Sequence, residues 1–187
     1  SWEDVQGFIA RIEERLPGLA LGLPSEAQWE YACRAGTETP FSFGPDVGTD
    51  QVNYNGSFPY AGGRKGEYRQ ETVPVGSLPV NPWGLFEMHG NVWEWCLNKY
   101  DDPEDTAIDE SGEPRVLRGG AWLLDPEYAR AANRGWHFPG LRNLEGTGCT
   151  EVAIMRNTLT TASLLALFVA GCGDSDSFTP PTPPPAE

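Results

Sequence analysis

Residues 23–32 read LPSEAQWEYA, and the position of Ser25 in this stretch predicts where a helix begins. Ser25 followed three residues later by Gln28 is a capping box, in which each side chain bonds the backbone N–H of the other residue. The expected apolar face has residues at helical spacing, namely Trp29, Ala32 and Cys33. Gly36 stands where a glycine typically ends a helix. The stretch therefore predicts a short amphipathic helix between Ser25 and Gly36.

A second helix is predicted upstream, at the start of the sequence. Ser1 and Asp4 have the spacing of a capping pair. Apolar residues then recur on one helical face, at Val5, Phe8, Ile9, Ile12 and Leu16. Because the sequence opens directly on this helix and without a methionine, we expect it to be cut from a larger domain.

Downstream of Gly36 the sequence predicts short strands joined by long turns, because Gly, Pro, Asn and Asp recur every few residues. Residues 90–95 (GNVWEW) alternate, so that Trp93 and Trp95 should share one face of a strand and Glu94 the other. Residues 115–118 (RVLR) alternate in the same way and lead into two glycines. An α+β fold with little regular structure follows from this pattern.

Composition and charge exclude several classes of protein. With 187 residues the chain has room for one domain with a real core, and the 22 glycines and 17 prolines argue against a helical bundle. The 7 Trp, 8 Phe and 6 Tyr indicate a loop-rich domain held by buried aromatic rings. A net charge of −14 argues against binding to nucleic acid or to an anionic membrane surface.

Five stretches in order resemble the formylglycine-generating enzyme family, also called sulfatase-modifying factor domains. The first is 23–32, quoted above, and the others are 52–56 (VNYNG), 72–76 (TVPVG), 81–95 (beginning NPWGL and ending GNVWEW) and 116–122 (VLRGGAW). The resemblance covers residues 1–148 and implies a C-type-lectin-like α+β fold, with two N-terminal helices followed by short strands and long loops. It also implies that about the first half of the usual domain is missing before Ser1.

The family's activity is the copper-dependent oxidation of a sulfatase cysteine to formylglycine, by two cysteines shortly after the RGG turn. Thiolate ligands suit Cu(I). In this sequence the two positions fall on Leu124 and Ala129, whose side chains cannot ligate a metal. We therefore expect a non-catalytic binding or accessory module that does not use copper, with a formylglycine-generating oxidase as the alternative.

The resemblance also implies structural calcium, in two sets of oxygen ligands. The first set comprises Asn53, Tyr54, Glu67 and Arg69, and the second comprises Glu87, Gly90, Val92 and Glu94. Mixed carboxylate, amide and carbonyl oxygens on a turn-rich backbone suit Ca²⁺. The alternative for Glu87 and Glu94 is that they are buried carboxylates that accept hydrogen bonds from the backbone of a turn.

Residues 121–148 predict a ligand-binding face. Positions that are usually Asn-rich in the family are apolar or aromatic here, notably Leu123, Leu124, Tyr128, Trp136, His137 and Phe138. This pattern resembles the ligand-binding surface of the variable proteins of diversity-generating retroelements, which share the fold. A rigid framework with aromatic anchors suits a binding surface. The partner would be an unidentified protein or small molecule, and the alternative is sequence drift in a domain without activity.

The remaining polar and sulfur-containing residues predict less chemistry. Residues 101–113 carry seven acids and are expected to form a solvated loop, since the EF-hand spacing is absent. His89 and His137 lie far apart and form no zinc motif. Cys33 should be a buried apolar side chain, although the family resemblance also implies a disulfide between Cys33 and Cys149 as an alternative.

Residues 149–187 are expected to form a tail unrelated to the domain. The apolar run 164–170 and the following Cys172 match a bacterial lipoprotein signal, and the run is too short to span a bilayer. Such signals act at N-termini, so we expect a misjoined reading frame that has replaced the family's closing strand, with a genuine C-terminal apolar helix as the alternative. The Pro-rich end, 178–187, should be extended. The sequence is compatible with a bacterial protein that is either cytoplasmic or exported.

Overall fold

The computed structural model describes residues 1–109, 111–142, 150–156 and 167–169. Helix α1 (Trp2–Arg15) and helix α2 (Glu26–Arg34) begin directly after Ser1 and Ser25, and both capping boxes are formed. Gly36 follows the end of α2 with a left-handed φ of 88°, which a residue with a side chain rarely adopts. Both predicted helices are therefore confirmed.

The strands form one sheet in the order β1-β5-β2-β3-β4, with β6 paired to β5. Their bounds are β1 (Leu21–Gly22), β2 (Trp93–Lys99), β3 (Arg115–Arg118), β4 (Gly135–His137), β5 (Thr150–Arg156) and β6 (Leu167–Val169). The β2–β5 pair is parallel and the other pairs are antiparallel. Two short 3₁₀ helices, η1 (Tyr60–Gly62) and η2 (Pro126–Ala129), lie in the loops. The architecture is the expected α+β fold.

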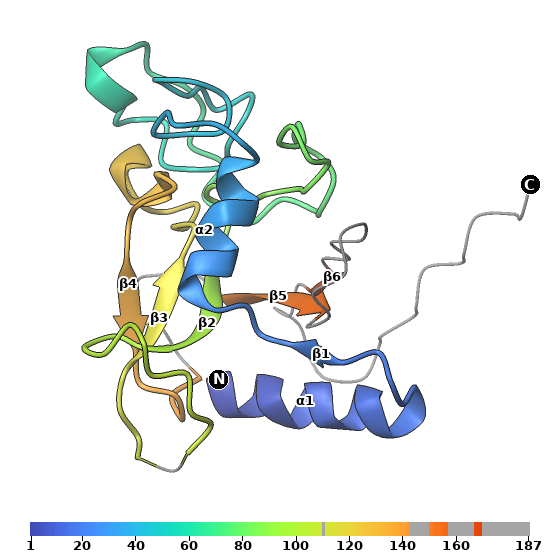
Figure 1. Ribbon diagram of the computed structural model, residues 1–187. Helices are drawn as coiled ribbons and strands as arrows, with labels where there is room; N and C mark the ends of the chain where they lie inside the picture. The colour runs from blue at the N-terminus through green and yellow to red at the C-terminus, as the bar shows by residue number, and fades with distance from the viewer. Residues whose placement is uncertain (110, 143–149, 157–166, 170–187) are drawn as a thin grey trace, which may run out of the picture.

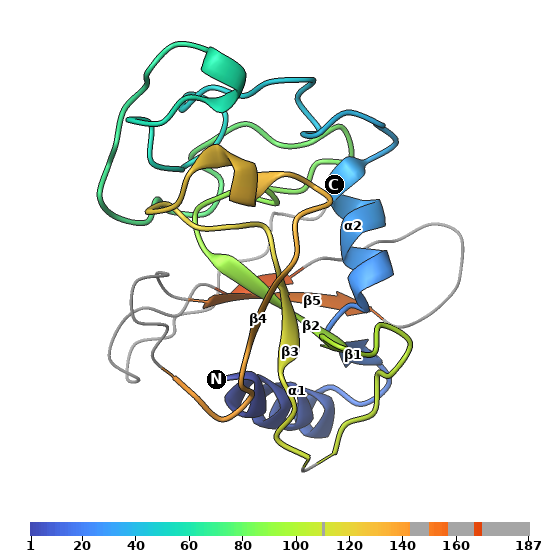
Figure 2. The same ribbon diagram turned by 90° about the vertical axis from the view of Figure 1, so that its left-hand side faces the viewer.

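The two helices cover opposite faces of the sheet (Figures 1 and 2). Trp93 and Trp95 of β2 pack against the apolar face of α1 in one buried cluster. Cys96 of β2 and Val116 of β3 pack with Trp29 of α2 in a second. Both faces of β2 are therefore buried, which explains why Glu94, on the face opposite the two tryptophans, is also shielded from solvent.

Long loops between α2 and β2 gather above the sheet in Figure 1 and enclose a third buried cluster. Phe41, Val52 and Tyr54 from these loops pack with Ala129 of η2. Gly90 lies so close to Asn53 that a Cβ at position 90 would come within 2.3 Å of the Asn53 carbonyl oxygen. Glycine at this position permits the loops to dock on the turn that precedes β2.

The structure differs from expectation in several strands. β2 begins at Trp93 rather than at residue 90 and continues to Lys99, and β4 had not been predicted. We expected no closing strand after Gly148, whereas residues 150–156 form β5 between β1 and β2. Of the tail features, Cys149, Cys172 and the Pro-rich end lie outside the described residues. Among the helices that are described, none is long and apolar enough to cross a membrane.

Candidate functional site

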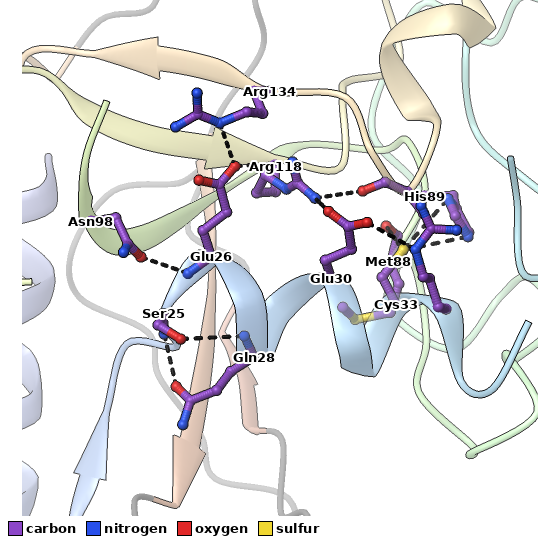
Figure 3. A network of polar contacts seen from close by, with 12 residues as sticks. Ser25, Glu26, Gln28, Glu30, Cys33, Met88, His89, Asn98, Arg118 and Arg134 are labelled. Carbon is purple, nitrogen blue, oxygen red and sulfur yellow. Dashed lines mark hydrogen bonds and ion pairs between the residues drawn. The ribbon is translucent and has the colours of Figure 1, made fainter. Parts of the chain in front are cut away.

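A buried arginine fastens the N-terminal half of α2 to the sheet (Figure 3). Arg118 of β3 is 1% exposed and forms ion pairs with Glu26, at 3.0 Å, and with Glu30. Its guanidinium also donates to the Ala131 carbonyl at 2.6 Å and lies over the ring of Trp29. A desolvated arginine must be paired, and here the residues of the LPSEAQWEYA stretch supply both carboxylates.

The glycines after Arg118 bring the segment that follows them into place. Gly119 and Gly120 both have left-handed φ, at 91° and 80°. A Cβ on Gly120 would lie 2.9 Å from the backbone of Tyr128, so the turn packs closely against η2. The segment that carries Leu124 and Ala129 therefore begins at a tight double-glycine turn that packs against η2.

Those two positions carry aliphatic side chains with no metal-binding atom. Leu124 is partly buried and packs against the core cluster beneath α1. Ala129 is 1% exposed and belongs to the third cluster. Its carbonyl accepts a hydrogen bond from His89 Nδ1 at 2.7 Å. Both residues thus help to pack the core of this domain.

The predicted binding face divides into an exposed part and a packed part. Trp136 and Phe138 are 48% and 45% exposed, and their rings meet edge to face with centroids 5.6 Å apart. His137 lies between them in sequence, and its ring contacts buried Trp95 on the other face of β4. Tyr128 on η2 is 46% exposed. Leu123, like Leu124, is partly buried.

Tyr100, which sequence reasoning missed, extends this face. The centroid of its ring lies 6.2 Å from that of Trp136. The guanidinium of Arg134 stacks on the Tyr100 ring, 4.7 Å from its centroid. Arg134 also donates to the Tyr100 carbonyl and to Glu26. Phe138, Trp136 and Tyr100 therefore form a continuous row of rings, which we call the aromatic row. No local pattern relates position 100 to positions 136 and 138, since the register of β3 and β4 creates the contact.

The residues of the first expected calcium set lie in different environments. Asn53 is fully buried, and its Nδ2 donates to the Glu71 carbonyl and to Asn91 Oδ1, both at 3.0 Å. Within the described residues, Asn53 Oδ1 is a buried acceptor with no donor. Glu67 is 65% exposed and pairs with Arg69 at 3.3 Å. Tyr54 was expected to contribute its backbone carbonyl, like Arg69; its side chain is buried, and its hydroxyl donates to the Val47 carbonyl at 3.2 Å.

The carboxylates of the second expected set bond to different parts of the fold. Glu87 accepts hydrogen bonds from the N–H of Gly76, at 3.1 and 3.2 Å, and burial raises the pKa of its carboxyl. Glu94 Oε2 accepts from the indole of Trp29 at 2.8 Å. Gly90 donates its N–H to the Gly119 carbonyl, and Val92 is buried. Glu87 thus accepts hydrogen bonds from the backbone of a turn, and the calcium role of this set stays a prediction.

His89 and Cys33 meet in the interior beside Ser42. His89 Nε2 accepts from the Ser42 N–H at 3.0 Å and lies 3.5 Å from the Cys33 sulfur. Burial lowers the pKa of His89 to about 4 and raises that of the Cys33 thiol. Cys33 is fully buried and free, as expected for an apolar side chain. This neutral cluster packs the core, and the adjoining cavity of about 10 Å³ has room for little more than a water molecule.

The acidic loop after β2 is fastened by a single lysine. Lys99 Nζ lies 2.8 Å from Asp105, 2.9 Å from Asp109 and 2.6 Å from Glu113. These hydrogen bonds raise the pKa of Lys99. The loop is mostly exposed, as predicted, but its contacts with Lys99 and with Arg115, which pairs with Asp109 and donates to the Ala107 carbonyl, were not foreseen.

The chain belongs to the family of the sulfatase-modifying factor enzyme 1-like domain, whose model matches residues 1–145. The serine/threonine-protein kinase pkn1 of Chlamydia caviae is 32% identical over 76% of this chain and 22% of the kinase. The formylglycine-generating enzyme of Mycobacterium tuberculosis is 38% identical over 57% of this chain and 41% of the enzyme. The chain thus spans less than half the length of these relatives.

Solved structures share the same fold. PvdO from Pseudomonas aeruginosa superposes with a TM-score of 0.60 at 31% identity, covering 74% of this chain and 54% of PvdO. Treponema denticola variable protein 1 superposes with a TM-score of 0.51 at 27% identity, covering 68% of this chain and 46% of that protein. Together with the family match, these similarities confirm the C-type-lectin-like fold that the resemblance implied.

Proposed function

We propose that this domain is a non-catalytic binding module of the family, which holds a partner through the face that carries the aromatic row. The observation that carries the proposal is a contrast within one segment. The family resemblance puts Leu124 and Ala129 where catalysis needs thiolates, while Trp136 and Phe138 are exposed and their rings are in contact. Exposed aromatic rings that touch one another are typical of interaction surfaces.

Two similarities support a binding role from different sides. The kinase relative has a region similar to this chain within a longer protein, as a recognition module would. The variable protein from Treponema denticola supports the specific alternative of a retroelement-type ligand-binding protein. The similarity to formylglycine-generating enzymes supports the other alternative, an oxidase that acts on a sulfatase cysteine, although such an activity would need ligands other than Leu124 and Ala129 for its copper.

The catalytic alternative is tested by loading the purified chain with copper and incubating it with a sulfatase-type cysteine peptide. We expect no formylglycine by mass spectrometry above a copper-only control, with a cysteine-containing family enzyme as the positive control. Product above that background would overturn the non-catalytic proposal.

The binding role is tested by selecting ligands from a displayed random-peptide library on the immobilised chain. Selected clones should bind the native chain and should lose binding to a Trp136→Ala/Phe138→Ala variant. The matched control is Tyr31→Ala/Trp83→Ala, because these two rings are also exposed and in edge-to-face contact at 4.8 Å, but are contributed by α2 and a loop. Clones that lose binding only to the control would place the interaction elsewhere.

We also propose that calcium supports the loops through the first set, with Asn53 Oδ1 and Glu67 as side-chain ligands. The buried acceptor on Asn53 supports this, because a buried polar atom requires a partner. Calcium that binds only the folded state should raise Tm. Glu67→Gln should remove most of that gain, whereas Glu38→Gln, an exposed carboxylate outside both sets, should leave it intact. If Glu67→Gln keeps the gain and Glu94→Gln removes it, the second set is the site.

A further inference from the structure

The aromatic row lies beside carboxylates that have no cation of their own. Three acids of the loop form ion pairs with Lys99, whereas Asp101, Asp102 and Glu104 are exposed. Among the described residues, none of these three forms an ion pair. Asp101 follows Tyr100 directly in the chain. The row therefore ends at an uncompensated negative patch, which we call the acidic edge and define as Asp101, Asp102 and Glu104.

Arg134 connects the aromatic row to the acidic edge. Its guanidinium lies over the ring of Tyr100 and donates to Glu26 at 2.6 Å. The pKa of Arg134 is raised, mainly by its hydrogen bond to Glu26 and also by the negative charge of Asp101. Because Arg134 forms its ion pair with Glu26, it leaves the negative charge of the acidic edge largely uncompensated.

An open pocket of about 530 Å³ adjoins the acidic edge at Glu104. Glu104 and Arg134 are among its lining residues, together with Glu26 and Glu30 of α2. Glu26 and Glu30 pair with Arg118 and Arg134, so Glu104 is the lining carboxylate that forms no ion pair among the described residues. A cationic side chain from a partner that lies along the row would find carboxylate oxygens at the end of it, and the net charge of −14 favours its approach.

The backbone at this surface indicates the shape of the partner. β4 is the last strand in the sheet order, and among the described strands it pairs only with β3. An open strand edge can accept an extended segment through main-chain hydrogen bonds. Trp136 and Phe138 are two residues apart, so their rings meet the alternate side chains of such a segment.

We propose that the partner is an extended basic peptide segment of another protein, with apolar side chains along the aromatic row and Lys or Arg side chains at the acidic edge. This inference rests on the proposed binding function and specifies the class of partner that the face binds. The rings would also attract a partner's cations through their π faces. Charge then selects the partner, while the aromatic row supplies most of the contact area.

The test uses three labelled ten-residue peptides with the same aromatic residues at alternate positions and Lys, Gln or Glu between them. Fluorescence anisotropy with the full chain should show the Lys peptide binding at least tenfold more tightly than the Glu peptide, with the preference falling as salt is raised. The triple variant Asp101→Asn/Asp102→Asn/Glu104→Gln should lose the preference. A control with the same charge change at exposed acids elsewhere, Glu14→Gln/Glu38→Gln/Glu71→Gln, should keep it.

The outcomes separate the two proposals. Equal binding of all three peptides, abolished by Trp136→Ala/Phe138→Ala, would overturn the charge preference and keep the binding face. Binding of the Lys peptide that survives this double variant would overturn the inference, because it would reflect unspecific attraction to an acidic protein. If none of the peptides binds at millimolar concentration, the inference fails, and the library selection decides the binding face independently.

Discussion

The indole of Trp29 donates a 2.8 Å hydrogen bond to Glu94, across 65 positions of sequence, and both side chains are shielded from solvent. This bond joins the helix of the LPSEAQWEYA stretch to the strand of the GNVWEW stretch. Two of the sequence motifs on which the family resemblance depends are thus the two sides of one buried contact.

Replacing this indole should therefore destabilise the fold. Trp29→Phe removes the donor and leaves a buried carboxylate with one hydrogen bond fewer, at a cost of ~1–3 kcal/mol in addition to the lost packing. Chemical denaturation would measure it. The aromatic control is Trp83→Phe, since Trp83 is exposed, and it should change the free energy of unfolding by less than about 0.5 kcal/mol. Equal effects of the two changes would contradict the assigned role of the bond.

The two arginines that share Glu26 should contribute very unequally to stability. Arg118→Ala leaves carboxylates facing a buried site and should cost ~3–5 kcal/mol. Arg134→Ala removes a partner from the same carboxylate at a site that is one-third exposed, so its cost should stay below about 1 kcal/mol. Urea denaturation of both variants measures the two losses of unfolding free energy. A loss for Arg134→Ala as large as that for Arg118→Ala would show that burial does not determine how much each arginine contributes to stability.

Stability should fall as pH drops below neutrality because of His89. Its pKa is about 4 in the folded protein and 6.5 in the absence of burial, so the unfolded chain takes up the proton first. The free energy of unfolding should decrease by roughly 3 kcal/mol as pH falls through this window. Comparing the pH dependence of native protein and His89→Asn isolates this part.

Lys99→Met should loosen the acidic loop without unfolding the domain. The three carboxylates around Lys99 would lose their common cation and repel one another. We expect faster hydrogen exchange, measured by mass spectrometry, in residues 101–109, and little change in Tm, since such partly exposed ion pairs contribute little. Lys65→Met is the matched control at an exposed lysine. Unchanged exchange in the loop would mean that its turns, rather than Lys99, fix its shape.

Local features of this fold could be predicted from the sequence, and contacts between distant segments could not. The helix starts at Ser1 and Ser25 were predicted correctly because a capping box involves residues three apart. The strand over residues 115–118 followed likewise from its alternation. By contrast, Arg118 meets Glu26 across 92 positions, a pairing that only the packing of β3 on α2 creates.

The candidate site shows the same division. That Trp136 and Phe138 lie in an apolar stretch was visible in the sequence, but their contact with Tyr100 depends on strand register. The family resemblance implied that Glu87 is a calcium ligand, with a carboxylate that accepts hydrogen bonds from a turn as the alternative, and in the fold it accepts hydrogen bonds from the N–H of Gly76. A carboxylate's partners depend on the tertiary structure, so composition alone could not separate the two roles.

The place of β5 in the sheet has a consequence for biosynthesis. The strand order β1-β5-β2-β3-β4 puts a segment made late between two that are made early. During synthesis on the ribosome, the edges of β1 and β2 that pair with β5 stay unpaired until residues 150–156 have left the exit tunnel. Non-local pairing of this kind slows folding and leaves unpaired edges exposed to other chains. A nascent chain of this domain is therefore a natural client for chaperones until its last central strand is inserted.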